Sequence, residues 1–96
     1  MTSLNDIKHN SYPTPVTGVT LRGIPEGHFA VFTRILGIES FYLLKGETGD
    51  MTAEIVGRLE SPKNAKSRAY RGNELKGGEF LGTNLWFLEA MELIVR

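Results

Sequence analysis

Apolar and polar residues alternate along residues 51–60, directly after a Gly49-Asp50 turn signal. One side of this run carries Ile55 and Leu59, and the other side carries Arg58 and Glu60. A period of two residues is typical of a β-strand with one buried face, and it does not match the 3.6-residue period of a helix. We therefore expect a strand here, with Arg58 directed outward.

The same reasoning predicts strands near residues 16–24, 28–36 and 39–45. In the 28–36 run, Phe29 and Val31 share one face, and Phe32 and Arg34 share the other. Gly and Pro separate the runs, and such residues favour turns. The expected fold class is all-β, a small barrel of five strands, with no internal repeat.

The segment from 84 to 96 is the most apolar part of the chain and fits two structures. As a helix it places Glu89, Glu92 and Arg96 on one narrow stripe, and its Leu, Ala and Met residues favour helix. As a strand it ends in β-rich residues and follows four other predicted strands. We predict a fifth strand over 84–95.

Ninety-six residues correspond to one small domain, predicted over residues 16–96. Residues 1–15 are polar with Pro13 and Pro15 near their end, which predicts a flexible tail. The chain has no cysteine, no apolar run long enough to cross a membrane and no signal-peptide pattern. A cytoplasmic protein without a metal or other cofactor is the expectation.

Zero net charge hides an uneven distribution of charge along the chain. Residues 57–76 hold six basic and two acidic side chains, a local charge of +4, and the rest of the chain carries −4. We predict that residues 61–78 form a long basic loop between the fourth and fifth strands. Such a loop is either a solvated segment or an arm that binds anions.

Residues 49–59 and 89–94 resemble the fourth and closing strands of OB-fold proteins, above all the bacterial single-strand DNA-binding proteins and the small primosomal replication protein. The resemblance implies an OB-like barrel whose long basic loop holds single strands. The helix that many OB domains carry between the third and fourth strands is absent from the pattern, as is an acidic C-terminal tail. A small phage or plasmid protein of DNA replication or recombination fits these departures best.

Single-strand binding requires cations along the backbone and flat rings on which bases stack. Tyr70 lies between basic residues and predicts a stacking platform, although its ring could instead pack against the barrel. Phe32 and Phe41 predict either an outer patch, or a position in the core or in a dimer contact. The predicted nucleic-acid contacts are Arg22, Phe32, Arg34, Phe41, Lys45, Arg58, Lys63, Lys66, Arg68, Tyr70, Arg71 and Lys76.

The expected partner is single-stranded DNA or RNA, bound without sequence preference. A second interpretation is an interaction module that binds a host protein or forms a structural oligomer. The C-terminal segment has more apolar residues than the inner surface of one small barrel can cover. We therefore predict a homodimer or higher oligomer, with Trp86, Leu88 and Ile94 at the interface. No nucleophile motif, phosphate loop or metal-ligand cluster is present, so we expect no enzyme activity.

Overall fold

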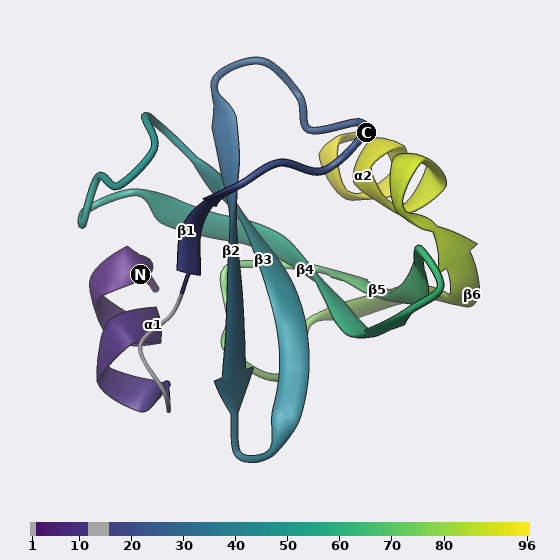
Figure 1. Ribbon diagram of the computed structural model, residues 1–96, viewed down its shortest axis with the longest axis horizontal. Helices are drawn as coiled ribbons and strands as arrows, with labels where there is room; N and C mark the ends of the chain where they lie inside the picture. Colours follow the sequence, from purple (N-terminus) through teal and green to yellow (C-terminus); the bar gives the residue numbers. More distant parts are fainter. Residues whose placement is uncertain (1, 12–15) are drawn as a thin grey trace.

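The computed structural model describes residues 2–11 and 16–96. The described chain is mostly β, with one antiparallel sheet in the order β1-β2-β3-β4-β5-β6 (Figure 1). No pairing closes β1 onto β6 among these residues, so the sheet is open and the predicted five-stranded barrel is not confirmed. The elements are α1 (Leu4–Asn10), β1 (Val16–Val19), β2 (His28–Ile35), β3 (Ile38–Lys45), β4 (Glu54–Lys63), β5 (Lys66–Arg71), β6 (Glu79–Trp86) and α2 (Phe87–Val95).

The two helices cover opposite faces of the sheet, at its two ends in Figure 1. Along β3, Tyr42 and Leu44 belong to the buried cluster that includes α1, whereas Leu43 belongs to the cluster that includes α2. Successive side chains of a strand point to opposite faces, so a strand with a helix on each side must be apolar on both. The apolar content of β3 is explained without a barrel interior.

A β-bulge at Val56 changes which side chains of β4 face each helix. Leu43 pairs with Gly57 and Leu44 pairs with Ile55, so Val56 is an extra residue on β4. Ile55 therefore lies in the α1 cluster, and Leu59 lies in the α2 cluster. The prediction that these two residues share a face was wrong, because an extra residue reverses the alternation that follows it.

The predicted flexible tail is wrong for its described part, which contains α1. Leu4 and Ile7 are fully buried, and the backbone N–H of Leu4 donates to the carbonyl of Ala53 at 2.9 Å. The Asp6 carboxylate accepts from the backbone N–H of Ser3, which caps the helix and lowers the pKa of Asp6. A helix of seven residues shows too few periods to be detected from its pattern. Residues 12–15, with both prolines, lie outside the described residues.

The C-terminal segment also differs from the predicted strand over 84–95. Strand β6 ends at Trp86, and α2 follows at once with Ala90, Met91 and Ile94 buried against the sheet. Spacings of one, three and four residues place these side chains on one helical face. Gly57 permits the close approach, since a Cβ built there would lie 2.6 Å from Ile94 Cγ2. The helical alternative was correct for residues 87–95, whereas residues 84–86 are a strand, as predicted.

The predicted basic loop over 61–78 is largely a β-hairpin. Asn64 and Ala65 form a two-residue turn with φ of +53° and +62°, and Lys63 pairs with Lys66 across it. Turns with two positive φ angles match the twist of the strands they join. Only residues 72–78 connect β5 to β6 without regular structure. Within the described residues, no helix is long and apolar enough to cross a membrane.

Candidate nucleic-acid interface

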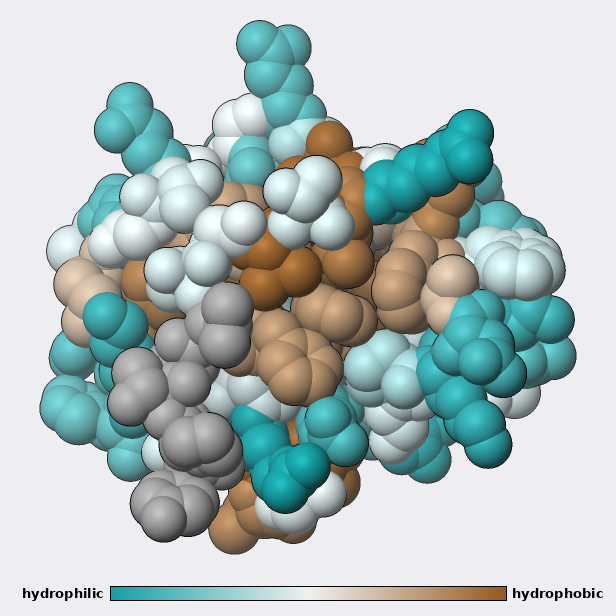
Figure 2. Space-filling model, viewed as in Figure 1, coloured by the Kyte–Doolittle hydropathy of each residue, from teal (hydrophilic) through white to brown (hydrophobic). Residues whose placement is uncertain are grey.

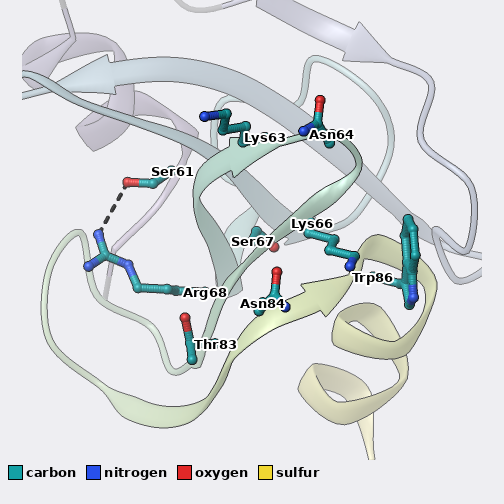
Figure 3. Close-up of a pocket in the computed structure, with 9 residues that line it drawn as sticks. All are labelled: Ser61, Lys63, Asn64, Lys66, Ser67, Arg68, Thr83, Asn84 and Trp86. Atoms are coloured by element: carbon teal, nitrogen blue, oxygen red, sulfur yellow. Dashed lines mark hydrogen bonds between the residues drawn. The ribbon is translucent and has the colours of Figure 1, made fainter.

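A groove of about 610 Å³ lies beside the β4–β5 hairpin and the end of β6 (Figure 3). Three cations and one tryptophan line it, together with five neutral residues that can form hydrogen bonds, and no carboxylate is among the described lining residues. The lining consists of Ser61, Lys63, Asn64, Lys66, Ser67, Arg68, Thr83, Asn84 and Trp86. The groove therefore offers positive charge, one aromatic ring and many neutral donors and acceptors.

Extra residues in β4 and β6, on either side of β5, shape this groove. The register shifts between Glu60 and Lys63 on β4, and again between Ser67 and Ala69 where β5 meets β6. Ser61 and Asn84 take left-handed backbone conformations at these shifts, with φ of +53° and +56°. A bulge bends its strand and redirects side chains, which explains why residues of both faces reach one groove.

Trp86 is the aromatic side of the groove and is 52% exposed. It pairs with Lys66 across the sheet, and the Lys66 ammonium lies 4.4 Å from the centre of its ring. Such a cation over an aromatic face is an attractive arrangement at an exposed site. The sequence analysis placed Trp86 at an oligomer interface and not among the nucleic-acid contacts. Its pairing with Lys66 is a feature of the β5–β6 register and is not visible in the sequence.

Lys63 and Arg68, the other two cations of the groove, differ in whether an acidic side chain pairs with them. Lys63 is exposed beside the hairpin turn and points away from the centre of the groove in Figure 3. Arg68 donates from Nη2 to Glu60 Oε1 at 2.8 Å and to Ser61 Oγ at 3.2 Å. Lys63 and Lys66 thus carry the net positive charge of the groove, and Arg68 contributes less.

Arg58 was predicted to face outward, and the structure corrects this. Because of the Val56 bulge it faces the α1 side opposite Tyr42, and it is 4% exposed. Its Nε donates to Glu60 Oε2 at 3.0 Å, and its Nη1 donates to the Gly77 carbonyl at 2.8 Å. Arg58 is a buried structural group that holds the 72–78 segment onto the sheet.

Tyr70 is not an open stacking platform. The guanidinium carbon of Arg58 lies 4.1 Å from the centre of its ring, and the Phe80 ring centre lies 5.4 Å away. The alternative in which Tyr70 packs against the sheet is the observed one. Nearby, the Tyr42 hydroxyl donates to the Leu75 carbonyl at 2.7 Å, and burial raises the pKa of Tyr42 to about 12.

Two further basic residues of the predicted arm lie away from the groove. Arg71 donates from Nη2 to the Leu93 carbonyl at 2.6 Å and lies 3.3 Å from Glu79, so it links β5 to α2 and β6. Lys76 is exposed on the 72–78 segment and borders a small cavity of about 20 Å³ beside Glu60. Of the six basic residues in 57–76, the groove gathers three.

The predicted contacts on the first three strands do not line the groove either. Phe41 packs 4.8 Å from Phe32 and 5.5 Å from Phe87 between ring centres, so it belongs to the apolar contact between the sheet and α2. Three exposed cations complete the predicted set. Arg34 pairs with Glu39, and Lys45 lies at the end of β3 away from the hairpin turn. Arg22 precedes Gly23, in the segment that contacts α2.

The three predicted interface residues separate into two groups. Trp86 and Leu88 are 52% and 43% exposed, as an interface residue of a free subunit would be. Ile94 is 3% exposed and lies in the α2 core cluster, so its assignment to an interface was wrong. Ile94 is buried and not exposed because this segment is a helix. Three residues after Met91, its side chain lies on the same inner face of α2, whereas a strand would have exposed it.

Residues 2–11 and 16–96 contain no group of three or more His, Asp or Glu side chains arranged to hold a metal ion. No protein-family model, curated protein or solved structure matches the chain. The resemblance to OB-fold proteins therefore stays a prediction made from residues 49–59 and 89–94.

Proposed function

We propose that the groove beside the β4–β5 hairpin binds single-stranded nucleic acid. The observation that supports this is an exposed tryptophan that lines one groove with Lys63, Lys66 and Arg68, a groove with no carboxylate in its described lining. Cations that follow the phosphates and a ring on which a base stacks are the two requirements of single-strand binding. Trp86 takes the stacking role that the sequence interpretation gave to Tyr70.

Binding through these groups is largely independent of base sequence, because phosphates and base faces carry little sequence information. The cellular role that we propose is the one that the OB-fold resemblance implies. It is single-strand binding in phage or plasmid DNA replication or recombination. Among its described lining residues, the groove has no nucleophilic side chain next to a histidine or carboxylate that could act as a general base. We therefore propose a binding protein and not an enzyme.

The test is a titration of the protein with labelled oligothymidylate at several salt concentrations. Replacing Lys63 and Lys66 together by alanine is expected to reduce the slope of log affinity against log salt by about 1.4, because each lysine that neutralises a phosphate adds about 0.7 to that slope. Trp86→Ala is expected to weaken binding by about 1–3 kcal/mol and to leave the slope unchanged, because no charge is removed.

Lys45→Ala is the matched control, because it removes an exposed lysine from the end of β3 opposite the hairpin. It is expected to leave both the affinity and the slope near the unmodified values. Equal effects of Lys45→Ala and the double change would show that binding is diffuse and not in the groove. No binding of the unmodified protein at low salt would contradict the proposed function.

A second candidate function is a self-associating or partner-binding module, and the exposed apolar side chains near α2 favour it. Leu88 and Val95 are 43% and 44% exposed near the two ends of α2, and Trp86 directly precedes this helix. If these residues pair two copies of the chain, light scattering at micromolar concentration gives a dimer mass, and Leu88→Asp gives a monomer. Leu88 does not line the groove, so this variant tests association separately from nucleic-acid binding. A monomer mass for the unmodified protein would remove this candidate.

A further inference from the structure

Strand β6 is the outer strand of the sheet, and its far edge is open (Figure 1). It pairs with β5 on one side, and no other backbone hydrogen bond joins residues 79–85 to a described segment of the chain. Edge strands are usually protected from pairing by Lys, Pro, charged side chains or bulges. Strand β6 has bulges, but it has no Lys or Pro, and its one charged residue, Glu79, lies at its start. This edge can therefore accept another strand.

The apolar pattern of β6 is symmetric about Thr83. Phe80 and Trp86 lie three residues before and after Thr83, and Leu81 and Leu85 lie two residues before and after it. Two copies of β6 paired antiparallel about Thr83 place each Phe80 opposite a Trp86, and each Leu81 opposite a Leu85. Aromatic and apolar residues that lie directly opposite each other stabilise antiparallel pairs. The strand is thus complementary to a second copy of itself.

The side chains that would meet lie on matching faces of the sheet. The Phe80 ring centre lies 5.4 Å from that of Tyr70, and the Trp86 ring centre lies 4.4 Å from the Lys66 ammonium. Tyr70 and Lys66 are four residues apart on β5, so both aromatic residues of β6 lie on the face that carries the groove. The two leucines of β6 pack instead toward the α2 core cluster on the other face.

Phe80 and Trp86 are poorly covered within one chain, at 56% and 52% exposed. Figure 2 shows hydrophobic side chains near the middle of the face in view, between β1 and α2. Apolar residues that are only partly buried, such as Leu21 and Phe41, still pack against the α2 core cluster. Phe80 and Trp86 belong to neither core cluster, so a partner on the β6 edge would bury surface that the chain itself leaves exposed.

We infer that β6 pairs antiparallel with β6 of a second copy, in a two-fold symmetric dimer centred on Thr83. A contact between identical strands of this kind is closed and does not continue into a filament. Each groove then continues past Trp86 onto Phe80 of the second copy. This surface differs from the exposed side of α2, and the inference does not depend on nucleic-acid binding.

A cysteine at the centre of the pairing tests the inference, because the chain has none of its own. Thr83 is exposed and pairs with no residue of β5, so Thr83→Cys leaves the β5–β6 pairs in place. Opposite residues of antiparallel strands lie about 4.5–5.5 Å apart between Cα atoms, within the range of a disulfide. Mild oxidation is therefore expected to give a disulfide-linked dimer on a denaturing gel.

Thr48→Cys is the matched control, since Thr48 is an exposed threonine in the connection between β3 and β4. Thiols held together in a dimer react at an effective concentration of roughly 1 mM, against micromolar protein in solution. Thr83→Cys should therefore cross-link on the order of 100-fold faster than Thr48→Cys.

The register is tested with Phe80→Cys and Trp86→Cys. These two variants should cross-link with each other when they are mixed, because residue 80 of one copy lies opposite residue 86 of the other. Neither variant should cross-link by itself at the rate of Thr83→Cys. Rapid cross-linking of Phe80→Cys alone would overturn the register centred on Thr83.

A disrupting variant completes the test. Thr83→Lys places two ammonium groups opposite each other, and like charges in that position destabilise a strand pair. Light scattering at micromolar concentration should give the mass of two chains for the unmodified protein and for Leu88→Asp, and of one chain for Thr83→Lys. Circular dichroism checks that Thr83→Lys remains folded.

Three outcomes would overturn the inference. They are a one-chain mass for the unmodified protein, equal cross-linking rates for Thr83→Cys and Thr48→Cys, and a dimer lost in Leu88→Asp but kept in Thr83→Lys. The last of these would place the contact on α2. Nucleic-acid binding is measured separately, so its absence would remove the proposed function and leave the β6 pairing in place.

Discussion

Replacing Arg58 by leucine is expected to lower the free energy of unfolding by about 3–5 kcal/mol, the usual effect of removing one partner of a buried ion pair. Arg58 is 4% exposed, and three groups depend on it: the Glu60 carboxylate, the Gly77 carbonyl and the Tyr70 ring. Glu60 keeps Arg68 at 2.8 Å, which places the loss toward the lower end of this range. Urea unfolding followed by circular dichroism measures the change.

Arg34→Leu is the matched control for this prediction. Arg34 pairs with Glu39 at 3.4 Å, but both side chains are about half exposed. Exposed ion pairs contribute about 0–1 kcal/mol, so this change should have little effect on unfolding. A second variant, Arg58→Leu with Glu60→Leu, should recover part of the loss, because no unpaired buried charge remains. A loss below about 1 kcal/mol for Arg58→Leu alone would contradict the buried position of Arg58.

Replacing Ile94 by alanine is expected to destabilise the protein by about 2–5 kcal/mol, the range for a large apolar side chain removed from a core. Ile94 is 3% exposed and packs with Leu59 and Met91 between α2 and the sheet. The shorter side chain would leave a cavity where α2 is held against the sheet. Thermal or urea unfolding measures this effect on the whole domain.

Leu88→Ala is the comparison, since Leu88 lies on the same helix but is 43% exposed. Surface substitutions of this kind usually change stability by less than about 0.5 kcal/mol. The pair of variants therefore separates the core side of α2 from its exposed side. If Ile94→Ala left stability unchanged and altered the mass in light scattering, Ile94 would be an interface residue as the sequence pattern had predicted.

Strands β2 and β3 could be predicted from the sequence alone because their alternation is uninterrupted. Phe29 and Val31 face α1 together with Tyr42 and Leu44, as the period of two residues requires. The short connection between these two strands, which contains Gly37, was equally clear. The sequence also located the basic residues of the hairpin, since clustering along the chain needs no tertiary information.

Tertiary structure decided which of those basic residues reach the groove. One extra residue at Val56 turned Arg58 from the surface into the core, and a bulge has no reliable signature in an alternating pattern. The amphipathic pattern of the C-terminal segment already favoured a helix, but the contact of Ile94 with Gly57 joins residues distant in the chain and could not be seen in that pattern. Trp86 entered the groove because β6 pairs with β5 and places it opposite Lys66. Local periodicity determines on which face of a strand or helix a side chain lies. Only the pairing of segments distant in the chain determines which residues that side chain contacts.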